Sequence, residues 1–154
     1  YEPVTGTLYT AQRGHGAWRN GERLHLSRTS QFKQCRTFLL PDFVTKQQPQ
    51  TARLRQALYQ QCRRVLDTWA PALDWCLVAS GRADLLVALA GRPIAPNADT
   101  LILEEAGGTI TDVSGQPFTG QGQRLLVGSN GTELHPACLR LLAQLESSSF
   151  PDFD

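Results

Sequence analysis

Residues 95–113 constrain the fold more than any other stretch, because they predict a helix that passes directly into a strand. Four apolar residues in its first half recur at the spacing of one helical face: Ala98, Leu101, Ile102 and Ala106. Pro96 lies where a first helical turn tolerates a missing N–H. Gly107 and Gly108 follow, and the first can adopt the left-handed conformation that ends a helix. The β-branched run 109–113 then predicts a strand.

Two acidic residues, Glu104 and Glu105, fall in the last turn of this predicted helix. The helix dipole disfavours negative charge there by roughly 0.3–1 kcal/mol. We interpret both as solvated or helix-end side chains rather than as catalytic groups.

The rest of the chain mixes strands and helices. Strands are predicted at residues 5–12, 36–40, 83–89 and 124–128, and a hairpin over 17–27 turns at Asn20-Gly21. Helices are predicted at residues 50–67, 72–80 and 134–145, and the polar segment 45–51 is predicted to be a loop. This mixture predicts one layered α/β (α+β) domain over residues 1–146, with 147–154 as a flexible C-terminal tail.

The composition sets the outer bounds on function. The chain has 154 residues, of which 41% are hydrophobic, which is enough for one domain with a real core. Fifteen Lys and Arg against fourteen Asp and Glu give a net charge of +1, so we expect neither nucleic acid nor an anionic membrane as a partner. No methionine is present, even at position 1, and we therefore expect the chain to be a fragment.

The cysteines and histidines form no pattern typical of a metal site. The cysteines lack C-x-x-C spacing and are expected to be reduced thiols of a cytoplasmic protein: Cys35, Cys62, Cys76 and Cys138. The histidines are expected on the surface or in loops: His15, His25 and His135.

Several segments together resemble a known family. G-R-A-D (81–84), E-E-A-G-G (104–108) followed by T-D-V-S-G-Q-P-F, and L-L-V-G-S-N-G-T-E-L-H (125–135) are similar to the C-terminal half of the inositol monophosphatase family. The segment 8–24 resembles the central hairpin of that family. The resemblance implies an α-β-α-β-α sandwich, of which this chain would be the C-terminal portion, with Asp84, Glu105, Gly107 and Gly108 as its structural motif.

The resemblance also implies a chemistry, in which carboxylates hold Mg²⁺ and the metal activates water to hydrolyse a phosphomonoester. In the family most of these carboxylates come from an early Glu and a D-P-[IV]-D-G-T motif, and both precede the segment matched here. Counting back from E-A-G-G, the tryptophan and aspartate of a W-D-x-A motif correspond to Ile94 and Ala95. The substrate-contacting acidic residue corresponds to Ala88.

The family's G-[ST]-A-A substrate loop corresponds to residues 69–72, so that its first two positions are occupied by Trp69 and Ala70. The matched positions therefore lack their functional side chains, and we predict no metal site in this chain. A shift of register would instead offer Asp99 as a ligand, although the spacing matches the family without a gap. Asp84 is interpreted as a structural hydrogen-bond acceptor.

Two functional hypotheses follow. In the first, the chain is a catalytically inactive member of the family, a pseudoenzyme that serves as an interaction module. In the alternative, it is the C-terminal half of an active Mg²⁺-dependent phosphomonoesterase acting on inositol phosphate or a similar small metabolite. We also expect a homo-oligomer or a partner chain that supplies the missing half, with contacts near the Trp18 hairpin and near edge strands at residues 8–11 and 36–40. The competing expectation is a monomer in which the 45–51 loop or the tail folds over the gap.

Overall fold

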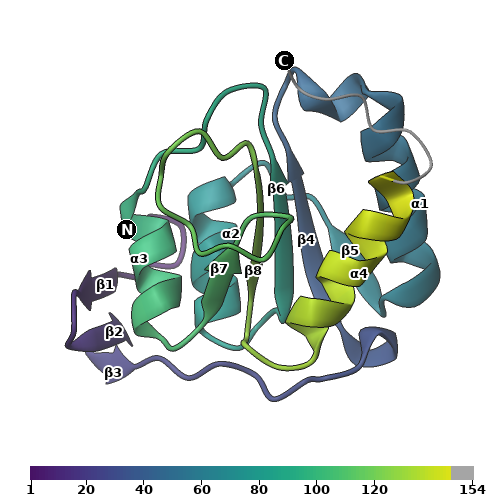
Figure 1. Cartoon of the computed structure of the whole chain (residues 1–154). Helices are drawn as coiled ribbons and strands as arrows, with labels where there is room; N and C mark the ends of the chain where they lie inside the picture. Colours follow the sequence, from purple (N-terminus) through teal and green to yellow (C-terminus); the bar gives the residue numbers. More distant parts are fainter. Residues whose placement is uncertain (147–154) are drawn as a thin grey trace.

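The computed structural model describes residues 1–146, and its centre is a five-stranded sheet with the strand order β5-β4-β6-β8-β7 (Figure 1). The strands are β4 (Arg36–Pro41), β5 (Arg64–Leu66), β6 (Leu85–Leu89), β7 (Thr109–Thr111) and β8 (Leu125–Ser129). β4 pairs in parallel with β5 and β6, while β8 pairs antiparallel with β6 and β7. The expected tail, 147–154, lies outside the described residues.

Helices cover both faces of this sheet. α1 (Pro49–Gln61) and α4 (Leu134–Glu146) lie on one face, and α2 (Pro71–Ala79) and α3 (Ala98–Glu105) lie on the other (Figure 1). β6 is buried along its whole length and divides its side chains between the two sides. Leu86 and Ala88 join the core under α2 and α3, whereas Leu85 and Val87 join the core under α1 and α4. The alternation follows from the two-residue period of a strand.

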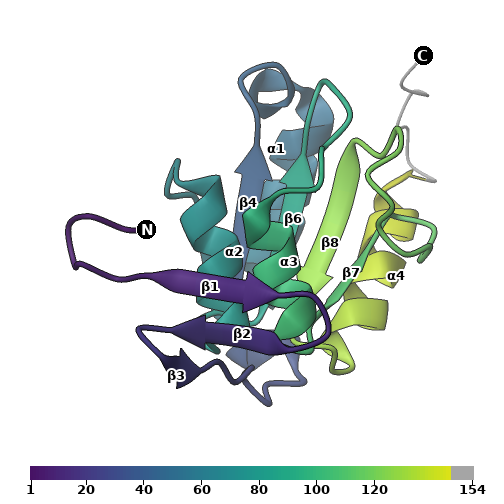
Figure 2. The ribbon, with the colours of Figure 1, turned by 90° about the vertical axis from the view of Figure 1, so that its left-hand side faces the viewer.

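A smaller sheet forms a further layer. β1 (Tyr9–Gln12), β2 (Gly16–Arg19) and β3 (Glu22–Arg23) make an antiparallel meander that lies against α3 (Figure 2). The order of layers is therefore small sheet, helices, large sheet, helices, and the layered α/β fold is confirmed. Two short 3₁₀ helices, Phe32–Gln34 and Thr45–Gln47, complete the elements.

The helix predicted within residues 95–113 is present as α3, but its buried face differs from the predicted one. Ala98 is exposed, and the buried residues of α3 are Thr100, Ile102 and Leu103. The helix lies between two sheets, so that it buries a wider face than the one-sided stripe that the sequence pattern predicts. Gly107 follows at φ +91°, as expected for a helix end.

Strand β5 was not predicted from the sequence, and its presence corrects two predictions. The predicted helix 50–67 ends at Gln61, and residues 64–66 form β5 instead. The N–H of Arg63 donates to the carbonyl of Phe32 and that of Arg64 donates to Cys35, both at 3.2 Å. β5 thus covers the side of β4, so the prediction that residues 36–40 form a sheet edge is wrong.

The predicted loop 45–51 is also partly wrong. It contains the 3₁₀ helix Thr45–Gln47 and the first residues of α1. Pro49 begins that helix, a position where the missing proline N–H leaves no bond unmade.

Candidate functional site

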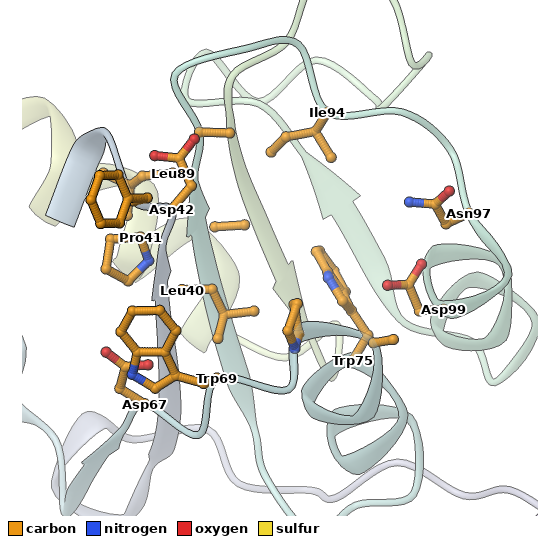
Figure 3. Close-up of a pocket in the computed structure, with 15 residues that line it drawn as sticks. Leu40, Pro41, Asp42, Asp67, Trp69, Trp75, Leu89, Ile94, Asn97 and Asp99 are labelled. Carbon is orange, nitrogen blue, oxygen red and sulfur yellow. The ribbon is translucent and has the colours of Figure 1, made fainter. Parts of the chain in front are cut away.

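A cavity of about 440 Å³ opens where β4 and β6 end (Figure 3). Its walls come from the residues after β4, the residues after β6, the start of α2 and the segment that enters α3. Parallel strands β4 and β6 present their carboxyl ends together here, which is where ligands bind in many layered α/β proteins. Most lining side chains are apolar, including Leu40, Trp75 and Ile94.

The structure brings together some of the positions singled out from the sequence. Ala88 and Trp69 line the cavity, and Ala70 lines an adjoining groove of about 480 Å³. Ala95 is exposed and follows Ile94, a lining residue. Ala88 and Ala95 thus present methyl groups at and beside this cavity, and a methyl group offers no oxygen to a metal ion.

Three carboxylates do surround the cavity: Asp42, Asp67 and Asp99. Asp42 is fully engaged by neighbours. Its Oδ1 accepts hydrogen bonds from the N–H and hydroxyl of Thr45 at 2.8 and 2.9 Å, and its Oδ2 accepts from the N–H of Gly91 at 2.7 Å. Burial opposes ionisation of Asp42, but these hydrogen bonds outweigh it and lower its pKa. Asp42 therefore fixes the two turns after β4 and β6.

The other two carboxylates lie apart from it (Figure 3). Asp67 is exposed and pairs with Arg55 at 4.0 Å. Asp99 accepts the N–H of Thr100 at 2.8 Å, and burial raises its pKa. No set of three acidic, histidine or cysteine side chains in residues 1–146 is placed to hold a metal ion. The donor set described here does not fit Mg²⁺.

An aromatic pair that sequence reasoning missed stands at the mouth of the cavity. Phe43 and Trp69 are 73% and 71% exposed. The Nζ of Lys46 lies 4.6 Å from the ring centroid of each, within cation–π range. Trp69 has a positive φ of 59°, which is uncommon for a bulky residue. No sequence spacing links these residues, because two of them follow β4 and the third precedes α2.

The predicted structural motif lies at the opposite end of the sheet. Asp84 is completely buried just before β6, and it accepts the N–H of Arg36 at 2.7 Å and the hydroxyl of Ser27 at 2.5 Å. The guanidinium of Arg36 pairs with it at 3.2 Å. Burial opposes ionisation, but the bonds from Arg36 and Ser27 prevail and lower the pKa of Asp84.

Glu105 and the glycine pair join α3 to its neighbours. The carboxylate of Glu105 accepts the N–H groups of Gly14 and Gly16 at 2.7 and 2.9 Å, which ties the turn between β1 and β2 to the end of the helix. These backbone hydrogen bonds lower its pKa. Gly108 is required by space, because a Cβ there would lie 2.4 Å from the Cδ1 of Leu103.

Two further buried polar groups were not foreseen. His135 is buried, so its expected surface or loop position is wrong: its ring nitrogens bond the hydroxyls of Thr111 and Ser129 at 2.9 and 2.8 Å. Asp74 is completely buried in α2 and accepts the hydroxyl of Thr68. Burial raises the pKa of Asp74 to about 6. One signal of this burial was present in the sequence: Asp74 is an acidic residue inside a helix that was predicted to be apolar.

Comparison with known proteins shows which family the chain resembles. A sequence model of the family described as "Inositol monophosphatase family" matches residues 1–147. Human inositol monophosphatase 1 is 27% identical over 135 residues, which cover 84% of this chain and 48% of that protein. Inositol monophosphatase of Mesembryanthemum crystallinum is 34% identical over 124 residues, covering 77% of this chain and 45% of that protein. The Nus factor SuhB of Vibrio cholerae is 32% identical over 116 residues, covering 75% and 43% respectively.

Solved structures have the same fold. The inositol monophosphatase of Thermotoga maritima superimposes with a TM-score of 0.81 at 26% identity, covering 95% of this chain and 55% of that one. That of Anabaena gives 0.81 at 28% identity, covering 94% and 57%. The chain thus spans about half the length of these relatives. None of the helices in residues 1–146 has the length and apolar character needed to cross a bilayer. By its sequence match and its fold, this chain belongs to the inositol monophosphatase family.

Proposed function

We propose that this chain is a non-catalytic module of the inositol monophosphatase family, a pseudoenzyme whose role is interaction. The observation that carries the proposal is the pair of alanines, Ala88 and Ala95, at the positions that the resemblance gives to acidic groups. The nearby carboxylates do not replace them, because Asp42 is satisfied by backbone donors and Asp67 pairs with Arg55. A divalent ion held only through water gains little over bulk solution.

The alternative is half of an active Mg²⁺-dependent phosphomonoesterase, whose remaining carboxylates would come from residues beyond this segment. The observation in its favour is the open cavity at the ends of β4 and β6, with Asp99 on its wall. In this alternative Asp99 would be the ligand that the chain contributes.

Calorimetric titration with Mg²⁺ and a phosphate-release assay with inositol phosphate separate the two proposals when they are run on a protein that extends this segment with the residues that would supply the remaining carboxylates. We expect neither a specific binding heat nor turnover. Asp99→Asn is the diagnostic variant, and Asp67→Asn at the exposed rim is its matched control. Mg²⁺-dependent turnover that is lost in Asp99→Asn and kept in Asp67→Asn would establish the alternative.

We further propose that residues 1–146 form one domain and associate with a second copy or with a chain that carries the other half of the family fold. In support, β1 is an edge strand of the small sheet, and three apolar side chains near it are exposed: Tyr1, Val4 and Leu8. A cytoplasmic location, supported by four free cysteines, and the absence of a nucleic-acid partner stay predictions.

Sedimentation equilibrium across a wide concentration range tests the association. We expect a mass above 17.0 kDa that rises with concentration. Leu8→Lys should weaken it by charging the edge, whereas Tyr59→Lys, at an exposed aromatic position on α1, should leave it unchanged. A 17.0 kDa species at every concentration, with slowly exchanging amides in β1, would contradict the proposal.

A further inference from the structure

Two of the cysteines meet on the side of the large sheet away from the cavity. Cys35 immediately precedes β4, and Cys62 immediately follows α1. Two backbone hydrogen bonds join the segments that carry these cysteines. The N–H of Arg63 donates to the carbonyl of Phe32, and the N–H of Arg64 donates to the carbonyl of Cys35, both at 3.2 Å. These bonds hold the two segments side by side, and both cysteines pack in the core under α1 and α4.

The two thiols have different environments. Cys35 is completely buried in the core under α1 and α4, whereas Cys62 is only partly buried against that core. Cys62 therefore keeps part of its surface in solvent, whereas Cys35 keeps none. Such a pair combines an accessible attacking thiol with a sheltered second thiol.

The charge distribution favours the same division of roles. The hydrogen bond from Cys35 lowers the pKa of Cys62, in opposition to burial and to the Asp84 carboxylate. The same hydrogen bond, together with burial and the nearby Asp84 and Cys138, raises the pKa of Cys35. Cys62 is thus the thiol that ionises, and Cys35 retains its proton and donates it.

We propose that Cys62 and Cys35 form a redox-active dithiol site that hydrogen peroxide converts to an intramolecular disulfide. The Cys62 thiolate attacks one peroxide oxygen, which breaks the O–O bond and gives a sulfenic acid and hydroxide. The Cys35 sulfur then attacks the Cys62 sulfur, the S–O bond breaks, and the released hydroxide takes the Cys35 proton as water. Two thiols and one peroxide yield one disulfide and two waters, so that the peroxide gains the two electrons that the sulfurs lose.

The test exposes the full chain to limiting hydrogen peroxide, alkylates the remaining thiols and maps the products by peptide mass spectrometry. The expected product is a Cys35–Cys62 disulfide that dithiothreitol reverses, with Cys76 and Cys138 still alkylated. Cys62→Ser should abolish it, and Cys76→Ala, on the opposite side of the sheet, should leave it unchanged. No disulfide, a bridge that involves Cys138, or only a bridge between chains would overturn the proposal.

A second measurement tests the roles of the two sulfurs. Iodoacetamide should alkylate Cys62 before the other cysteines. As the pH is raised, the midpoint of its pH–rate profile should come at a lower pH than for an ordinary thiol. In Cys35→Ala that profile should move to higher pH, the rate at neutral pH should fall several-fold, and peroxide should leave Cys62 as a sulfenic acid that dimedone traps. An unchanged profile in a folded Cys35→Ala would refute the assignment. If that variant does not fold, the mapped disulfide in the unmodified chain decides the outcome.

Discussion

The two ends of β6 differ in how they use polar groups. At its start, Asp84 is completely buried and is held by donors from Arg36 and Ser27. At its end, Ala88 faces a cavity with a methyl group, in a position that the resemblance gives to an acidic side chain. At the first end, a buried charge joins three segments of the fold, whereas the second end presents an apolar side chain to an open cavity. The comparison separates a group that stabilises the fold from a position whose chemical role stays a prediction.

The largest expected effect comes from removing the charge at the start of β6. Asp84→Ala leaves the backbone N–H of Arg36 and the hydroxyl of Ser27 without their acceptor, and each donor left unpaired away from water costs about 1–3 kcal/mol. Urea unfolding should record that loss in the free energy of unfolding. Asp67→Ala, at the exposed cavity rim, is the matched control and should change it by less than about 0.5 kcal/mol. Equal effects at both ends would remove the contrast.

A second change tests the packing under the cavity wall. A Cβ at Gly128 would lie 2.2 Å from the ring of Trp75, so Gly128→Ala should cost about 1–3 kcal/mol. Trp75→Leu removes the clashing ring atoms, so the double variant should be more stable than the sum of the two single losses predicts. Thermal unfolding of the four proteins gives the coupling. If the two losses of stability simply add, then α2 shifts away from Gly128 and the clash with Trp75 is not what costs the stability.

The third prediction is a pH dependence that arises from Asp74. Its pKa in the folded state is about 6, above the ordinary 3.8, so the folded state binds more protons than the unfolded state between those values. Asp74 therefore destabilises the protein progressively as pH rises through that window, and its destabilisation is complete above it. Asp74→Asn should raise the free energy of unfolding by about 1–3 kcal/mol at pH 8 and by much less at pH 4. A gain that is equal at both pH values would exclude the carboxylate as its cause.

The smallest effect is expected where the family's aspartate would stand. Ala95 is exposed, so Ala95→Asp should change the free energy of unfolding by less than about 0.5 kcal/mol. It should also create no Mg²⁺ binding, because one added carboxylate does not complete an octahedral site. Calorimetric titration checks this, with Ala98→Asp, at an exposed position of α3, as the control. Specific Mg²⁺ binding by Ala95→Asp alone would show that the cavity holds more ligands than the structure places there.

Local sequence patterns predicted most of the fold, and they failed where long-range pairing decided the outcome. The Gly107-Gly108 ending of α3 and the buried run in β6 were readable from helix caps and apolar periodicity. The apolar residues Leu54, Leu58, Cys62 and Leu66 recur every four residues and continue past Gln61, so the pattern could not show that Arg64 would bond to Cys35 and begin β5. Pairing between segments far apart in the chain overrides a local repeat.

The sequence pointed to the cavity only through the family resemblance. That resemblance singled out Ala88 and Ala95, and Ala88 lines the cavity, although the roles assigned to both positions stay predictions. No sequence motif indicated that the aromatic pair Phe43 and Trp69 would contact Lys46, because these residues come from separate turns. The burial of His135 was missed for the same reason: its hydroxyl partners, Thr111 and Ser129, come from two neighbouring strands.

The two tryptophans of the cavity give it an optical signature. Trp75 is 4% exposed, whereas Trp69 is 71% exposed with an ammonium group at its ring. A buried indole emits at shorter wavelength than a hydrated one, so the fluorescence of this cavity contains a blue component from its wall and a red component from its mouth. An occupant that displaces water from the mouth shifts the red component and leaves the blue one in place. In a Trp18→Phe variant, which removes the third indole, the cavity is therefore observable without any added label.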